Sequence, residues 1–200
     1  MRISSGEKKG RVLKCAQHSP LLRPITDKIK NAIFSILFDR VINAQVLDMF
    51  AGTGIFGFEA LSRGAENVTF VDKNYKNIKL IRENARKLQL DKRIAVLSRD
   101  FEEAMEYMEK MKRTFSIVFI DPPYNSDFAF KTLTHASFSS LIKPESLVIA
   151  RVHHKTNLPV FVNNLPASCG SKQAGMSVID ERKYGEAKVY FYKPTHDNPT

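Results

Sequence analysis

The sequence has few cysteines and no long apolar run. Its two cysteines, Cys15 and Cys169, lie far apart and form no CxxC pair, which leaves a disulfide scaffold and a zinc ribbon unsupported. No apolar run approaches the ~20 residues of a membrane helix, and charges interrupt the region where a signal peptide has its apolar stretch. The histidines show no HExxH pattern, so no metal is expected. We expect a cytoplasmic protein that has no membrane partner.

Acidic residues are scarce relative to basic ones. Lysine and arginine number 31 against 21 acidic residues, a formal net charge of +10. Such a surplus attracts polyanions through phosphate contacts and counterion release, which favours nucleic acid as the partner. A generic basic surface that keeps the protein soluble is the alternative. Glycine and proline number 9 each, and 43% of residues are hydrophobic, which excludes a collagen-like or disordered chain and suffices for one core.

The chain is predicted to form a single domain over residues 1–200, with a basic arm (1–24), an α/β body (25–193) and a tail (194–200). Short β-prone runs alternate with stretches of helical periodicity, which predicts βαβ units and a parallel sheet. Two late runs predict an antiparallel terminal hairpin. The predicted helices are 25–41, 55–63, 75–90, 101–111 and 127–141, and the predicted strands are 45–50, 67–72, 93–98, 115–121, 146–152, 176–182 and 188–192.

A glycine loop follows the first predicted strand. Gly52, Gly54 and Gly57 form a GxGxxG pattern that opens a helix, and Asp72 ends the next strand at the spacing of a dinucleotide-binding fingerprint. Glycines allow a ligand to approach the backbone closely, and a carboxylate at that strand end accepts the two ribose hydroxyls. A plain tight turn is the alternative. The pattern fits any cofactor that contains adenosine.

Asp48 distinguishes between NAD and S-adenosylmethionine as the expected cofactor. A carboxylate in this turn repels the pyrophosphate of NAD but attracts the ammonium and sulfonium groups of S-adenosylmethionine. Asp100 follows the third strand and could accept the adenine amino group, although a helix N-cap is an equal reading of it. Asp48 itself could also be a helix cap or a turn residue. The expected cofactor-binding residues are Asp48, Phe50, Gly52, Thr53, Gly54, Asp72, Lys73, Asp100 and Phe101.

An Asp-Pro-Pro-Tyr segment, residues 121–124, ends a buried strand. Two prolines stop a strand because they donate no ladder hydrogen bond, so a rigid strand exit is the simplest interpretation. Methylation of an amino group conjugated with a base ring needs acceptors that hold its hydrogens and turn its lone pair toward the methyl carbon. Asp121 and the Pro122 carbonyl could be these acceptors. Tyr124 could stack on a flipped base, worth about 1–3 kcal/mol.

These segments together resemble the bacterial RsmD family. The resemblance runs from about Arg2 to about Tyr192 and implies a 16S ribosomal RNA guanine N2-methyltransferase that uses S-adenosylmethionine. It also implies a Rossmann-like, mostly parallel seven-stranded sheet whose last strand is antiparallel. Isoleucine, asparagine and arginine depart from the family pattern at positions 25, 31 and 151, the last where the fifth strand commonly ends in an acid. The segments that carry the resemblance are Arg23-Pro24 and residues 48–54, 59–65, 121–124 and 183–185.

The leading hypothesis is methyl transfer to a guanine N2 amine in 16S ribosomal RNA. Adenine N6 in RNA or DNA and a glutamine amide are alternative acceptors. An NAD(P)-dependent oxidoreductase is disfavoured by Asp48 and the 121–124 segment, and a non-catalytic RNA-binding protein is disfavoured by Asp48, Asp72 and Asp121. We expect a monomer that acts on ribosomal RNA or on an assembling small subunit. The residues expected to bind RNA are Arg2, Lys8, Lys9, Arg11, Lys14 and Arg23.

Overall fold

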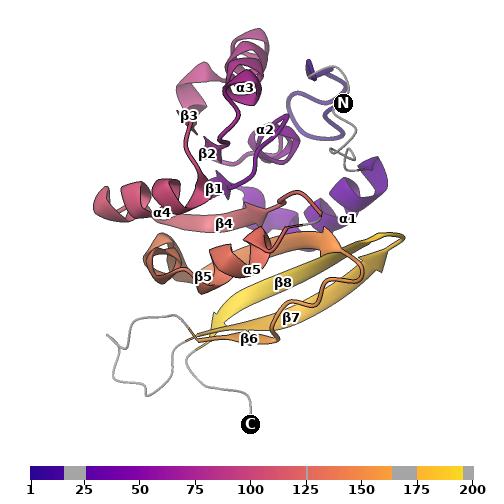
Figure 1. The fold of residues 1–200 in the computed structure, drawn as a ribbon. Helices are drawn as coiled ribbons and strands as arrows, with labels where there is room; N and C mark the ends of the chain where they lie inside the picture. The colour runs from indigo at the N-terminus through magenta and orange to yellow at the C-terminus, as the bar shows by residue number, and fades with distance from the viewer. Residues whose placement is uncertain (16–25, 125, 164–174, 196–200) are drawn as a thin grey trace. The chain divides into compact units, whose positions relative to one another are not determined.

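The computed structural model describes residues 1–15, 26–124, 126–163 and 175–195 (Figure 1). These residues fall into two compact units, Met1–Asp100 and Phe101–Thr200, which we call unit 1 and unit 2. The organisation of residues 1–200 as one domain stays a prediction.

Unit 1 contains three parallel strands, β1 (Gln45–Asp48), β2 (Asn67–Val71) and β3 (Ile94–Leu97). β2 is central and pairs with both β1 and β3. Both faces of β1 and β2 are largely buried, as expected for parallel strands that helices cover. The predicted parallel pairing is therefore confirmed here, and each strand ends one residue or more before its predicted end.

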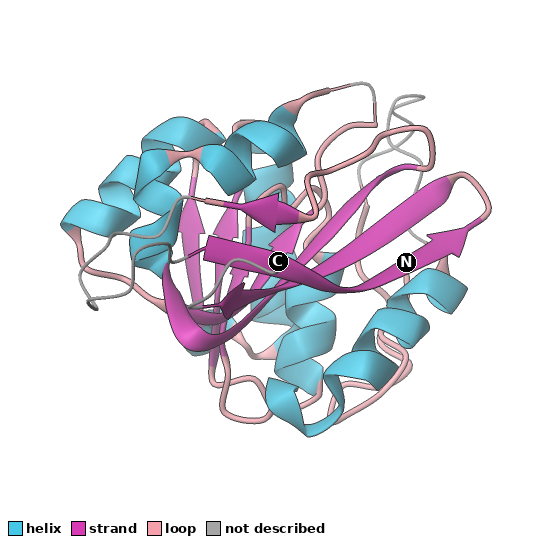
Figure 2. Ribbon diagram, turned by 90° about the horizontal axis from the view of Figure 1, so that it is seen from below, coloured by secondary structure: helices cyan, strands magenta, loops and turns pink. Residues whose placement is uncertain are grey.

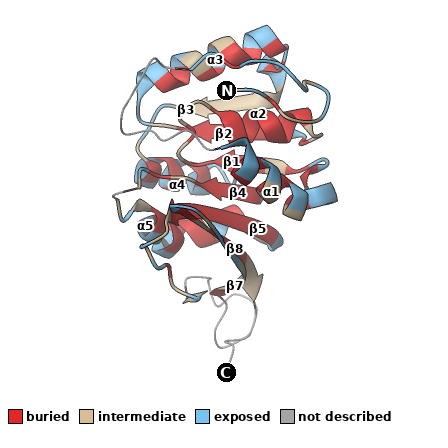
Figure 3. Ribbon diagram, turned by 90° about the vertical axis from the view of Figure 1, so that its right-hand side faces the viewer, coloured by how far each residue is buried: buried red, intermediate tan, exposed pale blue. Residues whose placement is uncertain are grey.

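The helices of unit 1 are α1 (Asp27–Leu37), α2 (Ile55–Ser62) and α3 (Tyr75–Leu88), with short 3-10 turns η1 (Phe38–Val41) and η2 (Asp91–Arg93). α2 is buried along its whole length, whereas α3 has a buried and an exposed face (Figure 3). A Cβ atom at Gly57 would lie 2.2 Å from the Phe70 ring. Glycine is required there because it lets α2 pack closely on β2.

Residues 1–15 are more ordered than the predicted arm suggested. Arg2 and Val12 form an antiparallel bridge, and the side chains of Ile3 and Leu13 are buried. A Cβ atom at Gly6 would lie 1.8 Å from the Ser62 carbonyl oxygen, so the segment touches the end of α2 directly. Two buried residues ten positions apart make no periodic pattern, so this packing could not be predicted from the sequence.

Unit 2 contains β4 (Phe115–Ile120) and β5 (Ile142–His153), which are parallel, and three strands that pair antiparallel (Figures 1 and 2). β8 (Ala187–Thr195) lies between β5 and β7 (Gly175–Tyr184). The predicted terminal hairpin is confirmed, and Gly185 enters its turn with φ +58°, as a tight hairpin turn demands. The two-residue strand β6 (Phe161–Val162), which was not predicted, pairs with β7.

The helices of unit 2 are α4 (Phe101–Lys110) and α5 (Phe128–Thr134), followed by the 3-10 turn η3 (Ala136–Leu141). The prediction of one helix over 127–141 was wrong, because His135 is extended at ψ 136° and interrupts it. β5 also begins four residues earlier than predicted. None of the helices in the described part of the chain is long and apolar enough to cross a membrane. The fold is α/β, with mainly parallel strands and an antiparallel C-terminal strand, as predicted. The described residues form eight strands instead of the predicted seven, because β6 adds one.

Candidate functional site

The glycine loop of unit 1 has a backbone that a ligand can approach. Gly52 and Gly54 have φ angles of +53° and +76°, and Gly54 is the residue that precedes α2. At Gly52 the nearest atom to an added Cβ is 3.9 Å away, so that side of the loop is open. At Gly54 the added atom would meet the Phe58 ring at 2.9 Å. The first glycine thus leaves room for a ligand and the second permits packing.

Asp72 holds the glycine loop in place. Its Oδ2 accepts hydrogen bonds from the Gly52 amide at 2.8 Å and the Asn77 side chain at 3.0 Å, while its Oδ1 accepts from the Asn74 amide at 2.8 Å. A carboxylate has about four lone-pair positions, so acceptor capacity remains for a ligand hydroxyl. Sequence spacing predicted a role for Asp72 toward the ribose, but its support of the loop becomes visible only in three dimensions.

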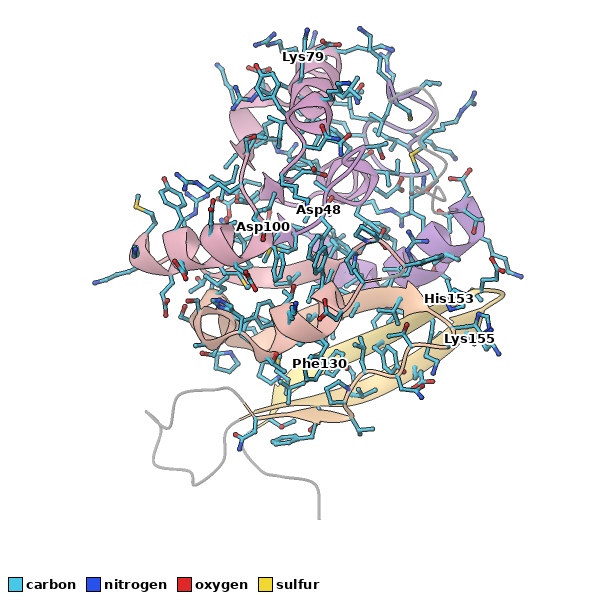
Figure 4. All side chains as sticks on the ribbon, viewed as in Figure 1. Asp48, Lys79, Asp100, Phe130, His153 and Lys155 are labelled. Carbon is cyan, nitrogen blue, oxygen red and sulfur yellow. The ribbon has the colours of Figure 1, made fainter. Side chains whose placement is uncertain are left out.

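Asp48 lies beneath the start of α2 (Figure 4). Its side chain is buried, and its Oδ2 accepts a hydrogen bond from the Gly57 amide at 3.2 Å. A negative charge at a helix N-terminus is stabilised by the unpaired amides there. Asp48 therefore fixes the start of α2, which matches the capping role that the sequence left open, and it places a carboxylate close to the glycine loop.

The remaining cofactor candidates are distributed over both units. Phe50 and Thr53 are half-buried, and the Thr53 hydroxyl lies 3.1 Å from the Met1 sulfur, which places the N-terminus beside the glycine loop. Lys73 and Asp100 approach each other at 3.9 Å. The last candidate, Phe101, begins unit 2, where it is buried and its ring centroid is 5.2 Å from that of Phe128.

In unit 2, Asp121 forms a bidentate ion pair with Arg151. Its Oδ1 accepts from Arg151 Nε at 2.7 Å and its Oδ2 accepts from Nη2 at 2.9 Å. The parallel register pairs Ile120 with Ala150, so the residues that follow them are neighbours at the ends of β4 and β5. The third guanidinium nitrogen donates to the Tyr124 hydroxyl at 3.0 Å. Arg151 therefore connects the first and last residues of the Asp-Pro-Pro-Tyr segment.

Sequence reasoning did not assign Arg151 to the site. Its guanidinium is nearly buried; burial lowers its pKa, but the adjacent Asp121 carboxylate raises it further, so the net pKa is above its usual value. Arg151 stays positively charged and fixes the Asp121 carboxylate in one orientation. Each Asp121 oxygen keeps a second lone pair that can accept another hydrogen bond. The signal in the sequence was the departure from the family pattern at this position.

Glu59, from the 59–65 segment, holds the N-terminal residues against α2. It is fully buried and accepts hydrogen bonds from the Ser4 amide and hydroxyl at 2.8 and 2.7 Å and from the Ser5 amide at 3.1 Å. Arg63 Nε at 2.8 Å and the buried Lys30 Nζ at 3.3 Å balance its charge. This part of the family pattern therefore has a structural role. Asn31, which also departs from the family pattern, has its side-chain oxygen 2.6 Å from the same Ser4 hydroxyl oxygen.

The basic residues expected to bind RNA differ in their surroundings. Arg2, Lys9 and Arg11 are exposed. Lys8 and Lys14 each lie next to an acid, Glu7 at 2.8 Å and Glu83 at 3.2 Å. Arg23 lies outside the described residues. The N-terminal segment therefore presents a positive surface on an ordered backbone.

Comparison with known proteins places these features in a family. The family model "Conserved hypothetical protein 95" matches residues 1–193. The YlbH protein of Bacillus subtilis (strain 168) is 36% identical over 82% of this chain and 89% of its own length. "Ribosomal RNA small subunit methyltransferase D" of Escherichia coli (strain K12) is 30% identical over 82% of this chain and 80% of its own length.

Solved structures agree with the fold. The yhhF methyltransferase structure from Escherichia coli has a TM-score of 0.79 and 26% identity, with 98% of this chain and 99% of that chain covered. A structure titled as the methyltransferase SMU.776 complexed with SAH has a TM-score of 0.63 and 18% identity; 83% of this chain and 48% of that chain are covered, and this likeness concerns the fold alone. The chain belongs to the RsmD family of methyltransferases, as its motifs predicted.

Proposed function

We propose that the protein transfers a methyl group from S-adenosylmethionine to the exocyclic N2 amine of a guanine in 16S ribosomal RNA. The observation that carries the proposal is the Asp121 carboxylate, which Arg151 fixes at the start of the Asp-Pro-Pro-Tyr segment in a chain of this family. Relatives of this chain are named small subunit ribosomal RNA methyltransferases. The basic surface of the N-terminal segment fits a polyanionic substrate.

The cofactor is S-adenosylmethionine, which supplies an activated methyl group on its sulfonium. The described residues of unit 1 fit it in three ways. The backbone is open at Gly52, Asp72 retains acceptor capacity for ribose hydroxyls, and Asp48 adds negative charge near the loop. We therefore assign cofactor binding to unit 1.

The acceptor base is assigned to the 121–124 segment of unit 2. Asp121 and the Pro122 carbonyl accept hydrogen bonds from the two N–H groups of the amine. These bonds direct the nitrogen lone pair toward the methyl carbon. As the amine attacks, its nitrogen becomes positive, so a carboxylate acceptor stabilises the transition state more than the ground state. The proton then leaves through Asp121 or water. Tyr124 supports the base by stacking, and Arg151 is the positioning residue.

Analysis of ribosomal RNA nucleosides tests this proposal. Mass mapping of 16S ribosomal RNA from cells with and without the gene should show one N2-methylguanine that is lost with the gene and restored by the wild-type chain. Loss of an N6-methyladenine instead would change the acceptor assignment. Unchanged RNA in the mutant, together with no methylation of RNA by the pure protein, would contradict the proposal.

Asp72→Ala is expected to weaken S-adenosylmethionine binding by about 10- to 150-fold, the equivalent of about 1.5–3 kcal/mol for a lost hydrogen bond to a charged acceptor. The variant loses the ribose acceptor and also the bond that fixes the Gly52 amide. Isothermal titration calorimetry measures the change. Asn77→Ala is the control, since it removes one bond to Asp72 but keeps the carboxylate. Tight NAD binding without S-adenosylmethionine binding would contradict the cofactor assignment.

The double variant Lys9→Glu/Arg11→Glu is expected to weaken binding of a 16S ribosomal RNA fragment, because two phosphate contacts are lost. The slope of log binding constant against log salt concentration should become less steep by about 2. Both residues are exposed, so the fold should be unaffected. Deletion of residues 1–14 is a poorer test because it would also remove the buried Ile3 and Leu13.

The control for this variant is Lys110→Glu/Lys112→Glu, with the same charge change at the end of α4 and the turn after it. Filter-binding titrations at several salt concentrations give the affinity and its salt dependence. Equal weakening by both double variants would show that net charge alone, and not the N-terminal segment, governs RNA binding.

A further inference from the structure

Unit 2 has a cavity of about 450 Å³ beside Tyr124. This volume falls within the range of about 300–1,000 Å³ that is typical of small-molecule sites. Neither Asp121 nor Pro122 lines it, so it adjoins the segment assigned to the reacting amine without containing that segment's acceptors. The cavity lies between the 121–124 segment, the first part of α5 with the residues just before it, and the end of β5 with the residues just after it. Its lining includes Tyr124, Asp127, Phe130, His153 and Asn157.

The cavity wall presents aromatic rings. Phe130, on α5, is 49% exposed, which is a large apolar area for a residue with no role in the core. The rings of Tyr124 and His153 meet edge to face at 5.7 Å between centroids. Aromatic surfaces of this kind stack on nucleobases of any sequence, because every base has a π face.

Polar groups on the same wall can contact a base edge. Asn157 Oδ1 accepts from Lys188 Nζ at 2.9 Å, which leaves the amide hydrogens of Asn157 as donors. Asp127, just before α5, offers a carboxylate on the same wall. Its side chain is 61% exposed and forms an ion pair with Lys131 at 3.0 Å. A cavity with aromatic walls and a few donors and acceptors suits a planar heterocycle better than an aliphatic ligand.

Lysines gather around the end of β5. Desolvation, and then the charges of Lys183, Lys155 and Lys188, lower the pKa of the adjacent His154. Lys183 and Lys188 face each other across the β7–β8 hairpin, and the His154 amide donates to Glu186 in the hairpin turn at 2.7 Å. The 183–185 part of the family pattern therefore brings positive charge to the strand end that lines the cavity.

Two of these lysines can meet phosphates. Lys188 pairs with Glu181 at 3.4 Å, whereas Lys155 and Lys183 are exposed. Figure 4 labels Lys155 with His153 at the end of β5 and Phe130 on α5. Exposed lysines next to an aromatic cavity are the combination found in sites for single-stranded nucleic acid, where the charge follows the backbone and the rings stack the bases.

We propose that this cavity binds the nucleobase next to the methylated guanine in the RNA strand, with Lys155 and Lys183 at the adjoining phosphates. The inference rests on the proposed RNA substrate and adds a second base-binding position to it. Stacking of the neighbouring base on Phe130 keeps the strand splayed open, so that the target base is free to reach Tyr124 and Asp121. The subsite therefore contributes affinity and register, and no chemical step occurs in it.

Abasic RNA tests the proposal. The probes are a synthetic 16S fragment that contains the mapped guanine and two copies in which the base on its 5′ or its 3′ side is removed. Wild-type protein with S-adenosylhomocysteine should bind one abasic copy about 10-fold more weakly than the intact fragment. Phe130→Ala should bind the intact fragment about 10-fold more weakly, and should not distinguish it from that abasic copy.

Matched variants separate this site from general effects. Tyr107→Ala removes another exposed aromatic side chain of unit 2, on α4, and should leave RNA affinity unchanged. Lys155→Glu should bind all three probes more weakly and should make the slope of log binding constant against log salt concentration less steep by about 1. Lys112→Glu should change neither the affinity nor the slope.

Two outcomes would overturn the inference: equal wild-type affinity for all three probes, or unchanged affinity in Phe130→Ala. If the guanine is still methylated in either case, the proposed function stands and only the subsite is wrong. If wild-type protein neither methylates nor binds the intact fragment, the proposed function itself fails.

Discussion

Asp121→Ala is expected to lower the single-turnover rate of guanine methylation by about 100-fold or more, while S-adenosylmethionine affinity changes by less than about twofold. The carboxylate contact strengthens as the amine nitrogen becomes positive, so its loss raises the barrier and not the cofactor dissociation constant. Rapid-quench assays with a 16S ribosomal RNA fragment, alongside calorimetry of cofactor binding, measure both quantities. Full activity in this variant would show that the chemistry lies on another loop.

The ion pair with Arg151 requires further variants. Asp121→Ala leaves the nearly buried Arg151 without its carboxylate, which can destabilise the local fold. Asp121→Asn keeps one acceptor oxygen, but its amide hydrogens meet a guanidinium N–H group. We therefore add Arg151→Gln, which leaves Asp121 in place, and the double variant Asp121→Asn/Arg151→Gln, which removes both charges together.

A catalytic role for Asp121 and a positioning role for Arg151 give different outcomes. We expect Arg151→Gln to lose less activity than Asp121→Ala, and the double variant to be as slow as Asp121→Asn alone. Thermal unfolding of each variant reports the structural cost separately. If Arg151→Gln is as slow as Asp121→Ala at equal stability, Asp121 acts only through its partner, and the assignment of the acceptor is wrong.

Glu59→Ala is expected to lower the free energy of unfolding by about 3–5 kcal/mol, because it leaves the buried Lys30 without its buried partner and several N-terminal hydrogen bonds without an acceptor. Urea denaturation measures this loss. Glu59→Gln is the matched control, since it keeps an acceptor oxygen and the side-chain volume, and it should lose less. A loss below about 1 kcal/mol in Glu59→Ala would contradict the role of Glu59 in holding the N-terminal segment.

Glu59 also predicts how stability depends on pH. Burial raises its pKa, but hydrogen bonds from Ser4 and Arg63 and the charge of Lys30 outweigh this, so the folded-state pKa is below the ordinary 4.5. As the pH falls below about 4.5, Glu59 becomes protonated in the unfolded chain before it does in the folded protein, and this favours unfolding. The contribution of Glu59 to stability is therefore fully present above about pH 4.5 and is lost as the pH falls through the folded-state pKa. The acid sensitivity of wild-type protein should therefore be reduced in Glu59→Gln.

Local sequence determined much of the architecture of each unit. The alternation of apolar runs with helical periodicity predicted parallel strands, and the GxGxxG pattern predicted the loop that opens α2. Two elements differ from the prediction. His135 interrupts the predicted helix over 127–141 because its backbone is extended, and β5 starts at Ile142 instead of at residue 146. Backbone conformation at such points depends on neighbouring strands that lie far away in the sequence.

The candidate residues were identified by type and spacing, but their partners were decided by the tertiary structure. The sequence by itself marked Asp48, Asp72 and Asp121 as functional carboxylates, because their positions after strands and glycines are local features. It could not pair Asp121 with Arg151 or Glu59 with Ser4, since those partners are 30 and 55 residues apart and meet only through strand register and helix packing. Hydrogen bonds and ion pairs depend on distances of about 3 Å, and only the folded chain sets such distances between remote residues.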